Sequence, residues 1–118
     1  MAANIVHVEI AGRDGGVLEK FYKELFHWDI RRENAGGCPY GKFDFKDLQG
    51  LTGGIRHEPE GEAEIVVYVQ VDDLKKYVSL AEALGGSIRI PPMRAGDLYF
   101  ALISDPENNP IGIIEGDQ

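Results

Sequence analysis

The stretch that decides the fold is residues 65–74, IVVYVQVDDL. Alternate side chains from Ile65 to Val71 are branched and aliphatic, so they share one face of an extended strand. The opposite face carries Val66, Tyr68 and Gln70. The two aspartates that follow are favoured helix N-caps, and the stretch therefore predicts a β-strand that leads directly into an α-helix.

The rest of this half of the chain completes one βαβββ pattern. The predicted helix runs from about residue 73 to 84, where Gly85 and Gly86 end it. Short apolar runs separated by turn residues then predict three more strands. These strands cover residues 87–90, 98–103 and 110–115.

The first half of the chain shows the same order of elements. A strand over residues 5–10 places His7 and Glu9 on one face and aliphatic side chains on the other. A helix is predicted over residues 14–27, with Asp14 as its N-cap. Its apolar side chains at amphipathic spacing are Leu18, Phe21, Tyr22 and Leu25. Three strands are again expected, over residues 29–33, 41–46 and 51–57.

The two halves superimpose at a nearly constant offset. His7 aligns with Val66, Phe26 with Leu84, Phe43 with Phe100, Asp47 with Asp105, and Gly54 with Gly112, at offsets of 57 to 59 residues. Two copies of one unit indicate a duplication. We therefore predict a single domain over residues 1–118: a first copy at about 4–57, a linker at 58–64 and a second copy at about 65–116. The fold class is α+β, with two tandem βαβββ units forming a curved mixed sheet with a concave cleft.

Composition excludes several classes of function. The 118 residues carry a formal net charge of −8, which argues against nucleic acid binding because phosphate neutralisation needs a basic surface. No apolar run is long enough for a membrane span, so no membrane partner is expected. The single cysteine, Cys38, excludes an internal disulfide and suits a cytoplasmic location.

Several motifs together resemble the glyoxalase/bleomycin-resistance/dihydroxybiphenyl-dioxygenase superfamily, also called the vicinal-oxygen-chelate superfamily. Residues 21–28, FYKELFHW, look like the end of the superfamily's first helix, although His27 stands where glycine is usual. Residues 71–74, VDDL, and 105–112, DPENNPIG, look like its second-unit signatures. Together with the proline pair at 91–92, the chain is most similar to the branch of predicted enzymes related to lactoylglutathione lyase. The resemblance covers essentially the whole chain and implies the βαβββ fold and a homodimer, which would also cover open sheet edges.

The resemblance also implies where a metal would bind. In metal-dependent members, the first and last strands of each unit supply the ligands, and the matching positions here are His7, about Gly54, Val66 and Gly112. Of these four, only His7 has a side chain that can ligate a metal, whereas zinc sites need three or four protein ligands. We therefore predict no cofactor and no four-ligand metal site. His57 and Glu115 lie three residues beyond the glycines, so they should face the other side of the sheet. A one-residue shift of the alignment, or a bulge, would bring in a divalent metal through one of them.

The predicted site is a small-molecule cleft lined by the face that the helices leave uncovered. His7 and Glu9 are the candidate catalytic residues, because a histidine and a carboxylate can transfer protons near neutral pH. Arg56, Tyr68 and Gln70 are the candidate substrate-binding residues, and Arg56 could either hold an anion or pair with Glu9.

Three functions remain open on the sequence. One is a glyoxalase-like lyase or isomerase that acts on a small polar molecule. The second is a non-enzymatic protein that binds or sequesters a drug or metabolite, similar to the drug-binding resistance proteins of this superfamily. The third is a component whose pocket is structural and whose partner is another protein.

Overall fold

The computed structural model describes residues 2–35, 38–45 and 49–116. The chain divides into two compact units. We call His7–Val66 the N-terminal unit, and Val67–Gln118 together with Met1–Val6 the C-terminal unit. The first strand therefore begins in one unit and continues in the other.

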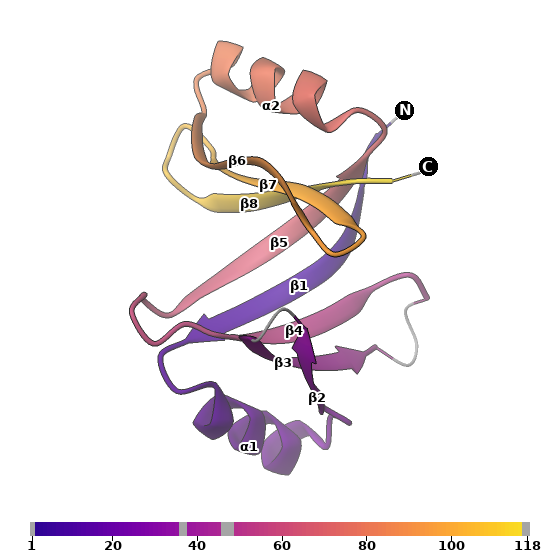
Figure 1. The fold of residues 1–118 in the computed structure, drawn as a ribbon, viewed down its shortest axis with the longest axis vertical. Coiled ribbons are helices and arrows are strands. Elements are labelled where there is room, and N and C mark those ends of the chain that lie inside the picture. The colour runs from indigo at the N-terminus through magenta and orange to yellow at the C-terminus, as the bar shows by residue number, and fades with distance from the viewer. Residues whose placement is uncertain (1, 36–37, 46–48, 117–118) are drawn as a thin grey trace. The chain divides into compact units, whose positions relative to one another are not determined.

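The described residues form eight strands and two helices, in the order βαβββ-βαβββ (Figure 1). The elements of the first copy are β1 (Asn4–Gly12), α1 (Gly15–Phe26), β2 (Arg31–Ala35), β3 (Cys38–Asp44) and β4 (Thr52–His57). Those of the second copy are β5 (Glu64–Val71), α2 (Leu74–Ala83), β6 (Ser87–Ala95), β7 (Leu98–Ser104) and β8 (Pro110–Glu115).

The two copies have identical strand connectivity. The strand order is β2-β3-β4-β1 in the first copy and β6-β7-β8-β5 in the second. In each copy the first and last strands pair in parallel, and the remaining neighbours pair antiparallel. Each helix packs on strands of its own copy (Figure 1). The α+β fold of two βαβββ units with mixed sheets is thus confirmed.

Both helices begin and end as their sequences predict. The Asp14 and Asp73 carboxylates accept hydrogen bonds from the backbone N–H groups of Val17 and Lys76, so each aspartate is an N-cap. His27 ends α1 in the left-handed conformation, at φ 61°. Histidine tolerates this region better than most residues with a side chain, which explains how it replaces the usual glycine.

The core of the C-terminal unit lies between α2 and its strands. Leu74 and Val78 of α2 pack on aliphatic side chains of β5, β7 and β8. The buried members of this core are Val71, Leu74, Val78, Ala101, Ile103 and Ile113. The side-chain alternation of β5 therefore directs Val71 toward the helix, as predicted from the sequence.

The core of the N-terminal unit is largely aromatic. Phe43 and Ile55 are buried, and the ring of Trp28 stacks on Phe43 with centroids 4.6 Å apart. Tyr22 of α1 stacks on the other side of this group, with its ring centroid 5.3 Å from that of Trp28. Aromatic surface therefore joins α1 to its sheet.

The buried face of α1 differs from the amphipathic pattern. Leu18 and Tyr22 pack on the core, but the side chains of Phe21 and Leu25 are each 54% exposed. Glu19 is buried in their place, because its carboxylate contacts His57 and Arg32 on the sheet. Glu19 therefore lies on the buried face of α1, which apolar spacing alone does not predict.

Strand β6 also extends beyond its predicted end. The sequence suggested that the strand stops at Ile90, before two prolines, whereas pairing with β7 continues to Ala95. The register shifts between Ile90 and Met93, so the prolines lie at an irregularity in the ladder. Proline is tolerated there because it has no N–H to donate to a regular ladder. Within the described ranges, neither helix is long and apolar enough to span a bilayer.

Truncation of the aromatic core should separate buried from exposed aromatic side chains. Phe43→Ala should destabilise the protein by about 3–5 kcal/mol, because Phe43 is 2% exposed and loses all its packing. Phe21→Ala should change stability by no more than about 0.5 kcal/mol. Urea unfolding followed by the fluorescence of the single Trp28 measures both. An equal loss in the two variants would mean that α1 buries Phe21 after all.

Candidate functional site

A set of polar side chains lies on the side of the N-terminal sheet away from α1. We call this set the polar face; its members are His7, Glu9, Tyr40, Thr52 and Arg56. They come from three neighbouring strands, and the pairing register places His7 opposite Thr52 and Tyr40 opposite Arg56. Strand alternation sends the neighbouring Ile10, Phe43 and Ile55 to the helix side.

The polar face is joined by a continuous chain of hydrogen bonds. His7 Nδ1 lies 2.6 Å from Thr52 Oγ1, and His7 Nε2 lies 2.8 Å from the Tyr40 hydroxyl. The Tyr40 hydroxyl donates to Glu9 Oε2 at 2.8 Å. Arg56 Nη1 donates to Glu9 Oε1 at 2.9 Å. His7 and Glu9, both predicted from the sequence, are thus connected through one tyrosine.

The direction of these bonds assigns the tautomer of His7. Glu9 accepts from both Arg56 and Tyr40, which is the pattern of an ionised carboxylate. The single proton of the Tyr40 hydroxyl is therefore given to Glu9, and its oxygen can only accept from His7. His7 accordingly carries its proton on Nε2, and its Nδ1 accepts from the Thr52 hydroxyl.

The environment keeps His7 neutral. Burial, together with the positive charge of nearby Lys42, lowers the pKa of His7 from 6.5 to about 4. Lys42 itself forms an ion pair with Glu33, with Nζ and Oε2 3.2 Å apart. Near neutral pH the imidazole is therefore uncharged, as the tautomer argument requires.

Arg56 is surrounded by carboxylates. Its guanidinium lies 2.9 Å from Glu9, 3.1 Å from Glu58 and 3.0 Å from Glu64. Of the two roles predicted for Arg56, pairing with Glu9 is the one that the structure shows. Three carboxylates around one guanidinium leave an excess of negative charge, which does not favour an anion at this position.

Gly54 allows Tyr40 to lie against the sheet. A Cβ atom at position 54 would overlap the hydroxyl end of the Tyr40 ring. The absence of a side chain at this residue is therefore a condition for the contacts of Tyr40 with His7 and Glu9. The C-terminal unit repeats the arrangement, because a Cβ at Gly112 would overlap the ring of Tyr68.

The other two predicted ligand-binding residues belong to the C-terminal unit. Tyr68 and Gln70 lie on β5, and Tyr68 is buried. Tyr68 pairs in register with Gly112, as Glu9 pairs with Gly54 in the first copy. Tyr68 is thus the counterpart of Glu9 in the duplication, and a role for Tyr68 and Gln70 in ligand binding stays a prediction.

Sequence reasoning did not find Tyr40 or Thr52. Tyr40 lies three residues from Phe43, and Thr52 lies three residues from Ile55. Because Phe43 and Ile55 face the helix, alternation along each strand places Tyr40 and Thr52 on the polar face. That parity, combined with a glycine at position 54 of the next strand, was the available signal. The contacts of Tyr40 depend on pairing between strands distant in sequence, so the signal could not be used before the register was known.

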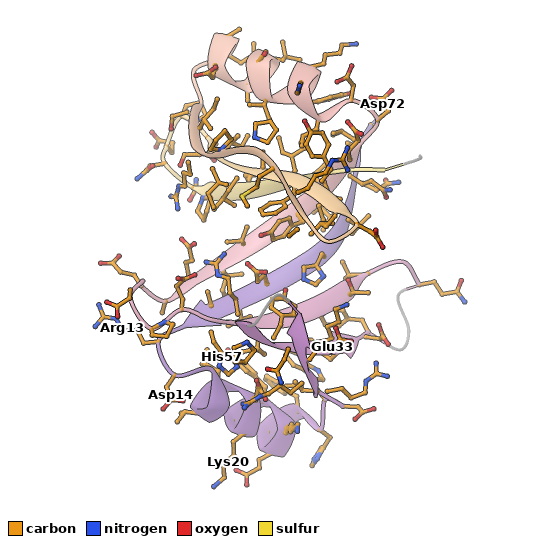
Figure 2. All side chains as sticks on the ribbon, in the orientation of Figure 1. Arg13, Asp14, Lys20, Glu33, His57 and Asp72 are labelled. Carbon is orange, nitrogen blue, oxygen red and sulfur yellow. The ribbon has the colours of Figure 1, made fainter. Side chains whose placement is uncertain are left out.

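A second polar cluster lies on the helix side of the same sheet. His57 Nε2 lies 2.7 Å from Glu19 Oε2, and Arg32 donates to Glu19 Oε1 at 3.2 Å. Figure 2 labels His57 near the start of α1, where a Cβ at Gly15 would overlap its ring. Burial acts to raise the pKa of Glu19, but hydrogen bonds from His57 and Arg32 outweigh it and leave that pKa below 4.5.

The helix-side location of His57 agrees with its strand parity, and Glu115 behaves in the same way. The Glu115 carboxylate accepts a hydrogen bond from the N–H of Leu74 at the start of α2. Both side chains therefore face helices, as their odd displacement from the glycines predicts.

The residues of the polar face do not fit the metal site of the superfamily. Among the residues that the structure describes, no group of three or more His, Cys, Asp and Glu side chains is arranged to hold an ion. Both ring nitrogens of His7 are engaged by hydroxyl groups, and Tyr40 covers the glycine from which another ligand would come. The donor set of the polar face therefore differs from that of a four-ligand site.

Comparison with known proteins shows the class of fold. No family model and no curated protein matches the sequence. Among solved structures, a hypothetical protein from Bacillus halodurans C-125 has a TM-score of 0.73 at 12% identity, covering 100% of this chain and 97% of the other. These values show a shared fold.

Methylmalonyl-CoA epimerases are also among the similar structures. The Streptomyces coelicolor enzyme, in complex with 2-nitronate-propionyl-CoA, has a TM-score of 0.70 at 13% identity over 98% of this chain and 96% of that one. The Mycobacterium tuberculosis enzyme has a TM-score of 0.66 at 15% identity, covering 100% of this chain and 94% of the other. The fold implied by the vicinal-oxygen-chelate resemblance is thus confirmed. The relation to the lactoylglutathione lyase branch stays a prediction.

The lowered pKa of His7 predicts a pH dependence of stability. The unfolded chain protonates this histidine below pH 6.5, but the folded chain only near pH 4, so its contribution to stability falls as the pH drops from 6.5 to 4. His7→Gln should lose less stability over this window, measured by urea unfolding. Lys42→Gln, which raises the folded pKa, should narrow the window. Parallel losses in wild type and His7→Gln would contradict the assignment.

Glu19 should affect the stability of the protein in a lower pH range than His7. Because its folded pKa lies below 4.5, its ion pairs stabilise the protein above pH 4.5 and are lost as the pH falls through the folded pKa. Glu19→Gln should therefore reduce stability near neutral pH and flatten the loss in acid. Glu24→Gln is the matched control, since Glu24 is exposed on the same helix. Equal effects of the two substitutions on acid unfolding would show that the contacts of Glu19 with His57 and Arg32 do not stabilise the folded protein.

Proposed function

We propose that this protein binds a small polar molecule at the polar face of its N-terminal unit and that His7 and Glu9 transfer a proton to or from it. The observation that supports the proposal is the hydrogen-bond chain from Thr52 through His7 and Tyr40 to Glu9. A neutral imidazole in such a chain has one nitrogen that donates and one that accepts, as general acid–base chemistry needs.

The chain of hydrogen bonds can transfer a proton without large side-chain movements. A proton that reaches His7 Nδ1 from the Thr52 side releases the Nε2 proton toward Tyr40, and Tyr40 in turn passes its own proton to Glu9. Arg56 balances the negative charge of Glu9 before the transfer. Glu9 would be the final proton acceptor, and Thr52 the end of the chain nearest the solvent.

Tyr68 and Gln70 are proposed as ligand contacts of the C-terminal unit. The duplication supports this proposal, since Tyr68 corresponds to Glu9 and lies over the matching glycine. Their hydroxyl and amide groups could orient hydrogen-bonding groups of a compact ligand. We also keep the homodimer and the absence of a resident cofactor as predictions.

The reaction class with most support is an isomerisation that moves a proton next to a carbonyl group. Methylmalonyl-CoA epimerases share the fold, and their name describes inversion at such a carbon. A proton acceptor and a proton donor joined in one chain suit that reaction better than a hydrolysis, for which no activated nucleophile stands out among the described residues.

A second candidate function is sequestration without turnover. The three carboxylates around Arg56 favour it, because a local excess of negative charge attracts cationic compounds. In this case the polar face would select the ligand by charge, and proton transfer would have no role.

A ligand screen tests binding. Hits that raise the thermal midpoint of the wild type should raise it less in His7→Ala and Tyr40→Phe, because these variants lose contacts of the polar face. Tyr68→Phe tests the proposed ligand contact of the C-terminal unit in the same way. Glu24→Gln, on the exposed surface of α1, should respond like the wild type. If all variants shift equally, the ligand binds elsewhere.

Turnover is tested separately from binding. Methylmalonyl-CoA and each hit are incubated with the protein in D₂O, and exchange of the carbon-bound proton is followed by NMR. Exchange that is lost in His7→Ala supports the isomerase. Binding without exchange in any compound supports sequestration instead.

A further inference from the structure

The Tyr40 hydroxyl stands between a histidine nitrogen and a carboxylate oxygen. It lies 2.8 Å from His7 Nε2 and 2.8 Å from Glu9 Oε2. These two atoms are of the types that bind divalent transition metals. An ion that bound to both atoms would have to lie between them, where the hydroxyl oxygen lies.

Two neighbouring features also bear on whether a metal ion could bind between His7 and Glu9. The Tyr40 ring covers Gly54, so a ligating side chain at position 54 and the tyrosine exclude each other. The guanidinium of Arg56 holds the other oxygen of Glu9 and supplies the positive charge that a buried carboxylate needs. Tyr40 thus contacts both the histidine and the carboxylate, and Arg56 balances the charge of the carboxylate.

We infer that Tyr40 occupies the position of a metal ion in this site, so that a hydroxyl joins His7 to Glu9. The inference is independent of the proposed function, since it concerns how the two side chains are held and not what they bind. It also assigns a reason for the glycine at position 54: any larger residue would displace the tyrosine.

The test is a Co²⁺ titration, in which the visible absorption reports coordination by protein ligands. The wild type and Tyr40→Phe should show no stoichiometric site, because the phenylalanine ring still covers Gly54. The double variant Tyr40→Ala/Gly54→Glu should bind one Co²⁺ per chain at least about 10-fold more tightly than the wild type, through His7, Glu9 and the new carboxylate. Zn²⁺ should displace the cobalt, and adding His7→Ala should abolish binding.

Two results would overturn the inference. One is a wild-type site for one Co²⁺ per chain that disappears in His7→Ala. The other is a double variant that is folded by circular dichroism but binds no more tightly than the wild type. If the double variant does not fold, Tyr40→Ala alone decides, since it opens the space without adding a side chain. It should bind Co²⁺ more tightly than Tyr40→Phe, and equal affinity would count against the inference.

Discussion

The buried carboxylate of Glu9 is the constraint on which the polar face depends. An ionised carboxylate that is 6% exposed is costly unless hydrogen bonds and an opposite charge surround it. Tyr40 and Arg56 supply both, from strands β3 and β4. Because Tyr40 must donate to Glu9, it can only accept from His7. The negative charge of Glu9 therefore determines which atom donates and which accepts in each hydrogen bond from Glu9 to His7.

The duplication has preserved geometry more strictly than chemistry. Both copies keep a glycine at the same place in their last strand, and in both a tyrosine ring covers it. The tyrosines come from different strands, Tyr40 from β3 and Tyr68 from β5. What is common to the copies is thus the space above the glycine. An aromatic ring can fill that space from either neighbouring strand, which explains how the copies diverged without a change of backbone.

The elements of the fold were predictable because they depend on local patterns. Alternation along β5, the aspartate caps of both helices and the left-handed His27 are each decided by a few adjacent residues. Errors arose where distant contacts compete with the local pattern. Apolar spacing placed Phe21 and Leu25 on the buried face of α1, but Glu19 is buried because His57 and Arg32, both remote in sequence, hold it there.

The sequence by itself determined the βαβββ repeat, the two faces of β1 and β5, and the presence of His7, Glu9 and Arg56 on one side of the sheet. Parity is a property of the extended backbone, so it needs no knowledge of neighbours. Only the tertiary structure decided that Tyr40 joins His7 to Glu9, that Arg56 pairs with three carboxylates, and which nitrogen of His7 carries the proton. Those outcomes require the register between strands and the close approach of ionisable groups, which long-range packing sets and no local pattern encodes.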